Sequence, residues 1–257
     1  IEWPKPERLT DGKFTVTSFK VSPDGAKLAF NHQPDPLINS FMKSDISWID
    51  LNTKKIVPLV TNKSSDGLAD WSPDSKELLY TSNEDDTTSN FYKNSKLFAI
   101  STSDGKTRRL ASKLDEDFGG QFTWRDEGIY VTLWNKTKRP IYKIDPKTGD
   151  YSIYLNTPDQ IFGVSFSKSG HFAANAKSDD QLNEIYFSAV ASPKLSKITN
   201  INDQIKNWSI ARSEVISWKS KDGATIEGIL HKPQGYDPTK KYPLLVVIHG
   251  GPTGIDY

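Results

Sequence analysis

The chain has 257 residues, with 33 Lys and Arg and 32 Asp and Glu, and its formal net charge is +1. This near balance gives no electrostatic basis for binding nucleic acid or an anionic membrane. It contains no cysteine, which excludes disulfides, thiolate nucleophiles and cysteine-based zinc sites and agrees with either a cytoplasmic or a periplasmic location. No apolar run approaches the ~20 residues of a membrane span.

A short repeat runs through the first 200 residues. Each copy has an aromatic residue or valine, then a turn related to Ser-Pro-Asp-Gly, then alternating apolar residues. In such a turn Pro fixes φ, Asp bonds back to the backbone and Gly tolerates positive φ, so the turn joins two antiparallel strands. The copies begin at Val21, Trp71, Trp124 and Phe166, and their offsets of 50, 53 and 42 residues are in the range of β-propeller blades.

A second hairpin follows each copy at a roughly constant distance. These hairpins lie near 46–59, 96–110, 141–154 and 184–199. Two hairpins per period make four antiparallel strands, which is the repeating unit of a β-propeller. We therefore predict an all-β fold with a partial propeller over residues 1–207. Its four visible blades are expected near 17–60, 67–111, 120–155 and 161–199.

From residue 208 the sequence changes character. A predicted hairpin has strands near 214–219 and 225–231, joined by a Lys-Asp-Gly turn. The run Leu244–Ile248 is apolar at every position, as is typical of a strand buried on both faces of a parallel sheet. It leads directly into His249-Gly250-Gly251-Pro252. Residues 208–257 are therefore predicted to form a hinge and the first strands of an α/β domain.

This order of motifs resembles the prolyl oligopeptidase family of serine peptidases, particularly its acylaminoacyl-peptidase and dipeptidyl-peptidase-like branch. The resemblance extends over the whole chain and is strongest at 218–228, 240–243 and 249–252, which are similar to the entry of that family's α/β-hydrolase domain. It implies that the four blades are part of a propeller of about seven. In that family the propeller caps the active site and restricts entry to short or unfolded peptides.

The glycine pair Gly250-Gly251 is the candidate catalytic feature. In α/β-hydrolases one N–H of the oxyanion hole comes from a loop after an early strand, often with a His-Gly-Gly motif. The resemblance implies that a backbone N–H of this pair donates to the tetrahedral oxyanion, while His249 and Pro252 shape the turn. Without a Cβ, the backbone can approach a substrate carbonyl. The structural alternative is a tight strand exit with no catalytic role.

The other catalytic residues of that family have no counterpart in this sequence. No Gly-x-Ser-x-Gly occurs, and the nearest approach is 163–167. His32, His171 and His231 are interpreted as structural or solvent-facing residues. The family places its Ser, Asp and His after the point where this chain ends, so we expect a fragment without peptidase activity of its own. No cofactor is expected, and no metal, since no carboxylate–histidine cluster has ligand spacing.

We therefore expect the propeller, or gating cap, of a serine oligopeptidase that hydrolyses short peptides by acyl-enzyme chemistry. The expected partners are peptide substrates and the rest of the same hydrolase domain, with homo-oligomerisation left open and neither nucleic acid nor membrane involved. Two alternatives also stay open: a stand-alone β-propeller that binds peptides or proteins without catalysis, and another hydrolase, such as an esterase, with the same entry. The residues that would set acylaminoacyl, dipeptidyl or endo specificity lie mostly outside these 257.

Overall fold

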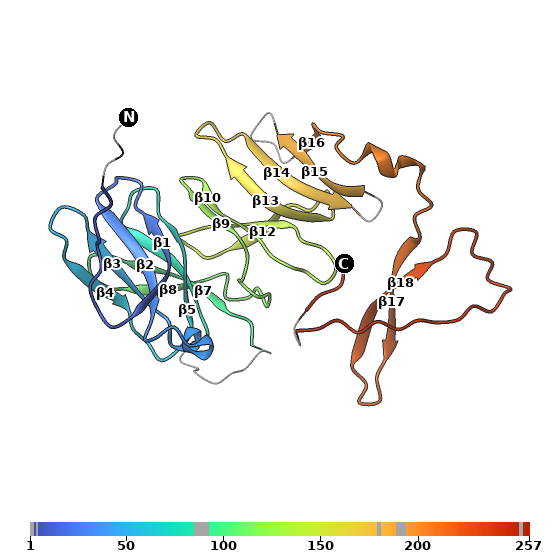
Figure 1. The fold of residues 1–257 in the computed structure, drawn as a ribbon, viewed down its shortest axis with the longest axis horizontal. Coiled ribbons are helices and arrows are strands. Elements are labelled where there is room, and N and C mark those ends of the chain that lie inside the picture. The colour runs from blue at the N-terminus through green and yellow to red at the C-terminus, as the bar shows by residue number, and fades with distance from the viewer. Residues whose placement is uncertain (1–2, 4, 85–92, 179–180, 189–193, 252–253) are drawn as a thin grey trace. The chain divides into compact units, whose positions relative to one another are not determined.

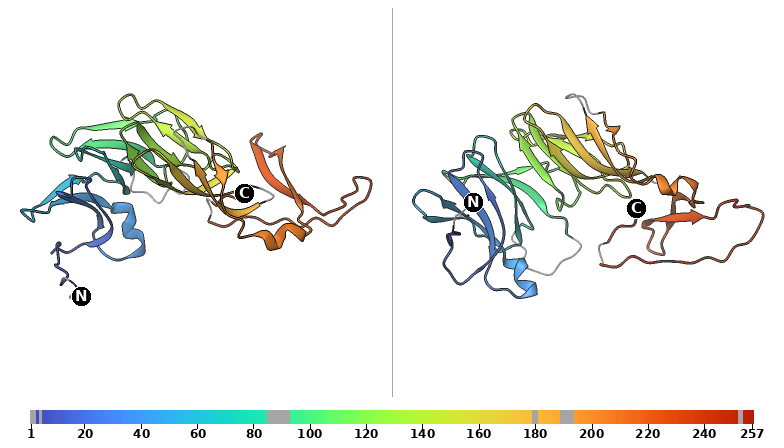
Figure 2. Two further views of the ribbon diagram at one scale, coloured as in Figure 1. Left: turned by 90° about the horizontal axis from the view of Figure 1, so that it is seen from above. Right: turned by 45° about the horizontal axis from the view of Figure 1, so that its top comes forward.

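The computed structural model describes residues 3, 5–84, 93–178, 181–188, 194–251 and 254–257 (Figure 1). Within these residues the regular structure is four four-stranded antiparallel sheets, one two-stranded sheet and two short 3-10 helices. Figure 2 shows the same sheets from two further directions. The predicted all-β class and its four-stranded blades are confirmed. No helix in the described part of the chain has the length and apolar character needed to cross a bilayer.

The strands of each four-stranded sheet follow one another along the chain as a meander. The first sheet comprises β1 (Thr15–Val21), β2 (Lys27–Gln33), β3 (Asp45–Asp50) and β4 (Ile56–Val60), with η1 (Ile38–Lys43) between β2 and β3. The second comprises β5 (Asp66–Trp71), β6 (Glu77–Ser82), β7 (Lys96–Ser101) and β8 (Thr107–Leu110). The third comprises β9 (Phe122–Arg125), β10 (Gly128–Thr132), β11 (Ile141–Ile144) and β12 (Tyr151–Leu155).

The remaining elements follow the same antiparallel pattern. The fourth sheet comprises β13 (Gln160–Phe166), β14 (Phe172–Ser178), β15 (Gln181–Ser188) and β16 (Ser196–Lys197). A 3-10 helix, η2 (Asp203–Asn207), then precedes a hairpin of β17 (Arg212–Lys219) and β18 (Thr225–Lys232).

The repeated Ser-Pro-Asp turn forms the hydrogen bonds that its residue types predict. In the first sheet Ser22 Oγ donates to Asp24 Oδ1 at 2.5 Å and accepts the amide N–H of Lys27 at 2.9 Å. In the second sheet Ser72 Oγ accepts the amide N–H of Glu77 at 2.9 Å. The hydrogen bond from Ser22 lowers the pKa of Asp24. The turn is therefore closed by its own side chains, which explains why its chemistry recurs.

We expect Ser72→Ala to lower the free energy of unfolding by about 1–2 kcal/mol. Ser72 is buried, and its hydroxyl accepts the amide N–H groups of Lys76 and Glu77. The substitution would deprive the Glu77 N–H of this acceptor, whereas the Lys76 N–H also donates to Asp74 Oδ1. Urea unfolding followed by tryptophan fluorescence measures this. Ser103→Ala, in the exposed turn after β7, is the matched control and should change stability little. Equal losses from the two substitutions would contradict the expectation.

The chain divides into two compact units, and the first comprises residues 1–133 and 142–152. One cluster of its buried side chains joins the first two sheets and includes Ile46 from β3 and Leu78 from β6. A second cluster joins the second and third sheets and includes Leu97 from β7 and Ile129 from β10. All four of these side chains are fully buried. The core of this unit is therefore formed by the side chains that each strand directs to the inner face of its sheet.

The second unit comprises residues 134–141 and 153–257. In this unit the loop 134–141 lies beside the start of β13, where a parallel bridge joins Arg139 to Gln160. The backbone N–H of Arg139 donates to the carbonyl of Asp159 at 2.8 Å, and the N–H of Ile161 donates to the carbonyl of Arg139 at 3.0 Å. These bonds attach the loop to the fourth sheet.

The apolar run Leu244–Ile248 differs from its sequence-based expectation. It has no regular secondary structure and pairs with no strand among the residues described. Its five side chains are 69–85% exposed. The expected parallel sheet is thus not formed in this structure, because the described residues provide no neighbouring strand that could satisfy the backbone of this run or cover its side chains.

Candidate functional site

The predicted oxyanion loop lies at the end of this exposed run. His249, Gly250 and Gly251 are all exposed, and Pro252 lies outside the described residues. The N–H of Gly254 donates to the carbonyl of Gly250 at 3.1 Å, and His249 Nδ1 lies 3.2 Å from the same oxygen. These contacts close a tight turn around the glycine pair.

The two glycines of the pair have different backbone conformations and surroundings. Gly251 has a φ of +131°, a conformation that L side chains rarely adopt. At Gly250 an added Cβ would meet nothing within 4 Å, so the space on that side of the residue is open. No described residue accepts a hydrogen bond from the N–H of either glycine. The loop can therefore donate to an external oxygen, and its role as an oxyanion hole stays a prediction.

The three histidines outside this loop each form a hydrogen bond to a serine. The pairs are His32 Nε2 with Ser47 Oγ at 2.9 Å, His171 Nδ1 with Ser169 Oγ at 3.4 Å, and His231 Nδ1 with Ser213 Oγ at 2.8 Å. The ring of His32 also packs on Phe14 and Phe30, and its burial lowers its pKa. His32 is thus a packed residue between aromatic rings.

The Ser213–His231 pair has the spacing of a nucleophile and its base. It arises from the register of the β17–β18 hairpin, in which the two residues lie opposite each other. An activated nucleophile also needs a third group that orients the base. The bond to Ser213 is the only hydrogen bond that the His231 side chain forms with the residues described. Within the described part of the chain, the pair therefore lacks the third member of a catalytic triad.

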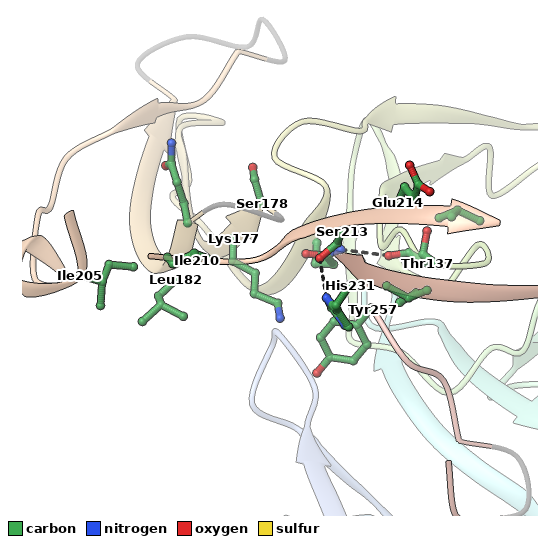
Figure 3. A pocket seen from close by; sticks show the side chains of 14 residues that line it. Thr137, Lys177, Ser178, Leu182, Ile205, Ile210, Ser213, Glu214, His231 and Tyr257 are labelled. Atoms are coloured by element: carbon green, nitrogen blue, oxygen red, sulfur yellow. Dashed lines mark hydrogen bonds between the residues drawn. The ribbon is translucent and has the colours of Figure 1, made fainter. Parts of the chain in front are cut away.

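The second unit contains a pocket of about 180 Å³, with Lys177, Tyr257 and the Ser213–His231 pair in its wall (Figure 3). Gln160, the first residue of β13, also lines it and is 2% exposed. Its Nε2 donates to the carbonyl of Thr137 at 3.0 Å, whereas its Oε1 has no partner among the residues described. The wall of the pocket thus includes a buried side chain with an unpaired acceptor.

Sequence reasoning did not identify the polar residues of this region. Arg139, Gln160 and Lys177 are separated in the sequence, but the bridge of Arg139 to Gln160 and the pairing of Gln160 with Lys177 place them in one row across adjacent strands. The sequence has no motif at these positions, and the row results from the register of β13 with its two neighbours. Only the tertiary structure brings the three together.

Comparison with curated proteins finds peptidases. No protein-family model matches the chain. It is 28% identical over 133 residues to the uncharacterized peptidase YuxL of Bacillus subtilis (strain 168), a match that covers 47% of this chain and 20% of that protein. It is 23% identical over 256 residues to dipeptidyl-peptidase 5 of Arthroderma otae, which covers 92% of this chain and 35% of that protein. The chain thus spans between a fifth and about a third of the length of these relatives.

Comparison with solved structures supports the same resemblance. A puromycin hydrolase S511A mutant complexed with PGG matches with a TM-score of 0.70 and 17% identity, over 96% of this chain and 39% of that chain. At this identity the match shows the fold. The sequence relatives are peptidases and the structural neighbours are members of the prolyl oligopeptidase family, so the predicted resemblance is confirmed. The chain is a homologue of these peptidases, and its four-stranded sheets have the fold of their propeller portion.

Proposed function

We propose that this chain is the propeller, or gating, portion of a serine peptidase that cleaves short peptides by acyl-enzyme chemistry. In this proposal residues 1–207 form part of the propeller, and residues 208–257 form a hinge and the start of an α/β-hydrolase domain. One observation carries the proposal: four propeller-type sheets are followed, in the same chain, by an exposed apolar run that ends in the His249–Gly251 turn.

The exposure of Leu244–Ile248 supports the hydrolase part of this proposal. Five consecutive apolar side chains in water are unfavourable, and burial of each would stabilise the protein by about 1.5–3 kcal/mol. A parallel sheet covered on both faces would provide that burial. We infer that further strands of the same protein pair with this run and hold the glycine turn at the edge of the sheet.

In the proposed mechanism the chain contributes one part of the catalytic machinery. As a serine Oγ attacks the peptide carbonyl, the carbonyl oxygen becomes an oxyanion, and a backbone N–H of Gly250 or Gly251 donates to it. The serine, the base that takes its proton and the acid that orients that base would come from further residues of the same protein. The propeller would restrict access to short peptides.

A fluorophosphonate probe, which labels activated serines covalently, tests the proposal. The natural protein would be isolated from its source with an antibody raised against these 257 residues. We expect a labelled polypeptide longer than this chain, whereas the recombinant chain alone should remain unlabelled and hydrolyse no peptide. Recovery of only an unlabelled polypeptide would contradict the proposal and favour a stand-alone propeller that binds peptides or proteins.

In that longer polypeptide we expect Gly251→Ala to lower kcat about a hundredfold with little change in KM. The substitution places a Cβ where φ is +131°, so the turn must rearrange and its N–H groups move away from the oxyanion. Gly163→Ala is the matched control, since the nearest atom to its new Cβ would be 4.0 Å away. Equal activities of the two variants would exclude the oxyanion role of this turn.

A further inference from the structure

The row formed by Arg139, Gln160 and Lys177 in the second unit has no part in the function proposed above. Arg139 is bridged to Gln160, and Gln160 is paired with Lys177, so the three residues lie on neighbouring strands at one level. Residues directly opposite one another in a sheet project from the same face. Two cations therefore flank one amide side chain.

The guanidinium of Arg139 is held by aromatic rings. Its central carbon lies 5.6 Å from the ring centroid of Trp134 and 5.2 Å from that of Phe162. Its Nε is buried and has no hydrogen-bond partner among the residues described. Burial lowers the pKa of Arg139. The stacking fixes the orientation of the guanidinium and leaves its N–H donors for another acceptor.

Lys177 lies on the same aromatic cluster. Its Nζ is 4.3 Å from the ring centroid of Tyr257, and this ring is in turn 4.4 Å from that of Trp134. Figure 3 shows the Lys177 side chain extending along the pocket toward Tyr257. In the described part of the chain no carboxylate forms an ion pair with Lys177. A second cation is thus available within reach of the pocket.

The nearby carboxylates of the loop and hairpin already have other partners. Asp159 forms an ion pair with Lys138 at 2.9 Å, and Glu227 forms one with Lys136 at 2.7 Å. No ion pair is formed by Arg139 with any described residue. Among the residues described, no side-chain carboxylate therefore pairs with this cation, and its favourable charge interaction is with Tyr257. The absence of a carboxylate partner in the described part of the chain favours binding of an external anion.

The third member of the row indicates what kind of anion fits. Gln160 is 2% exposed and its Nε2 donates to the carbonyl of Thr137, so its unpaired Oε1 is an acceptor. A ligand for this row should carry both a negative group for the cations and an N–H for Gln160. The C-terminal end of a peptide has both, because its α-carboxylate adjoins a backbone N–H. Sulfate, which carries no hydrogen at neutral pH, would leave Gln160 without a donor.

We propose that Arg139 and Lys177 bind the α-carboxylate of a short peptide while Gln160 accepts a hydrogen bond from its backbone. This inference rests on the proposed function, since it identifies the peptides that the gating portion would retain. Arg139 supplies paired charge-assisted hydrogen bonds, and Lys177 supplies a point charge. The site would favour peptides with a free C-terminus over amidated ones.

Calorimetric titration of the 257-residue chain tests the site. The two probes are acetyl-Gly-Phe with a free carboxylate and its C-terminal amide. We expect the acid to bind at least tenfold more tightly than the amide, and Arg139→Gln to weaken acid binding about tenfold without changing amide binding. Lys177→Gln should act in the same direction and keeps the claim testable if Arg139→Gln does not fold. Lys106→Gln, an exposed cation paired with Asp104, is the matched control and should leave binding unchanged.

Several outcomes would contradict the proposed carboxylate site. These are equal binding of acid and amide, no binding of either, unchanged acid binding in both variants, or displacement of the acid by an equal concentration of sulfate. The last would show an anion site without peptide selectivity. Fluorophosphonate labelling reports separately on the peptidase. If the chain binds the acid selectively but the natural protein is not labelled, the carboxylate site stands and the peptidase proposal fails. If the natural protein is labelled but the chain does not prefer the acid, the peptidase proposal stands and the carboxylate site fails.

Discussion

Asn31→Ala is expected to destabilise the first unit by about 4 kcal/mol, the largest effect that we anticipate for a single substitution. The Asn31 side chain in β2 donates to the carbonyls of Asp45 at 3.0 Å and Asp66 at 2.8 Å, and it accepts the N–H of Leu68 at 2.5 Å. It thus connects the first sheet to the second. The substitution removes the Asn31 partner of the Asp45 carbonyl and of the Leu68 N–H at a buried position, whereas the Asp66 carbonyl still accepts from Ser44 Oγ. Each group left unpaired costs about 1–3 kcal/mol.

Urea unfolding, followed by tryptophan fluorescence, to which Trp48 and Trp71 of the first unit contribute, measures this loss. Asn52→Ala is the matched control, because Asn52 lies in an exposed turn after β3 and makes no comparable connection. It should change the free energy of unfolding by less than about 0.5 kcal/mol. If Asn31→Ala also changed the free energy of unfolding by less than about 0.5 kcal/mol, the connection between the two sheets would not depend on this amide.

Asp66→Asn is expected to stabilise the protein at pH 7 by about 3 kcal/mol. Asp66 is 2% exposed, and its Oδ2 has no partner among the residues described. Burial raises the pKa of Asp66 from 3.8 to about 6. This shift of about two pKa units corresponds to about 3 kcal/mol of preference for the neutral acid. Asparagine has nearly the same shape and never ionises, so it removes the cost of burying the charge.

The sign of the pH dependence follows from this raised pKa. Between pH 4 and 6 the folded state binds a proton that the unfolded state has released, so the stability due to Asp66 is fully present below about pH 4 and is lost as the pH rises through 6. The difference in unfolding free energy between Asp66→Asn and the unsubstituted chain should therefore grow from near zero at pH 4 to its full value at pH 7. Urea titrations at several pH values measure it.

Asp104→Asn provides a control of opposite sign. Asp104 lies in an exposed turn, where the hydrogen bond from Ser101 lowers its pKa. Its contribution to stability is therefore present above the unfolded pKa and is lost as the pH falls. A stability difference for Asp66→Asn that did not vary between pH 4 and 7 would show that the Asp66 carboxyl titrates normally in the folded chain.

The sequence predicted the sheets because the interactions that define them are local. The turn at Ser22 is closed by bonds that span at most five residues, and the same residue types recur at Ser72. The alternation of apolar residues along each strand is likewise visible without knowledge of its neighbours. These features were sufficient for the all-β class and the four-stranded repeat. The resemblance to the peptidase family rested above all on the contiguous segments 218–228, 240–243 and 249–252.

The glycine turn, which we propose as part of an oxyanion hole, was recognisable for a different reason. Its motif, His249-Gly250-Gly251, is contiguous, and the positive φ of Gly251 agrees with the backbone freedom for which glycine was singled out. The burial predicted for Leu244–Ile248 depends on strands that the described residues do not include. A periodic or apolar pattern indicates that a segment should be covered but does not specify what covers it.

The sequence by itself therefore determined the class of fold, the repeating unit and the family resemblance. The tertiary structure alone decided which polar side chains meet: Asn31 with the backbone of Asp66, 35 residues away, and Arg139 and Gln160 with Lys177. The physical reason is that a strand's own pattern sets which of its residues face inward, whereas the register between strands sets their neighbours. Register depends on contacts between segments that are distant in the chain.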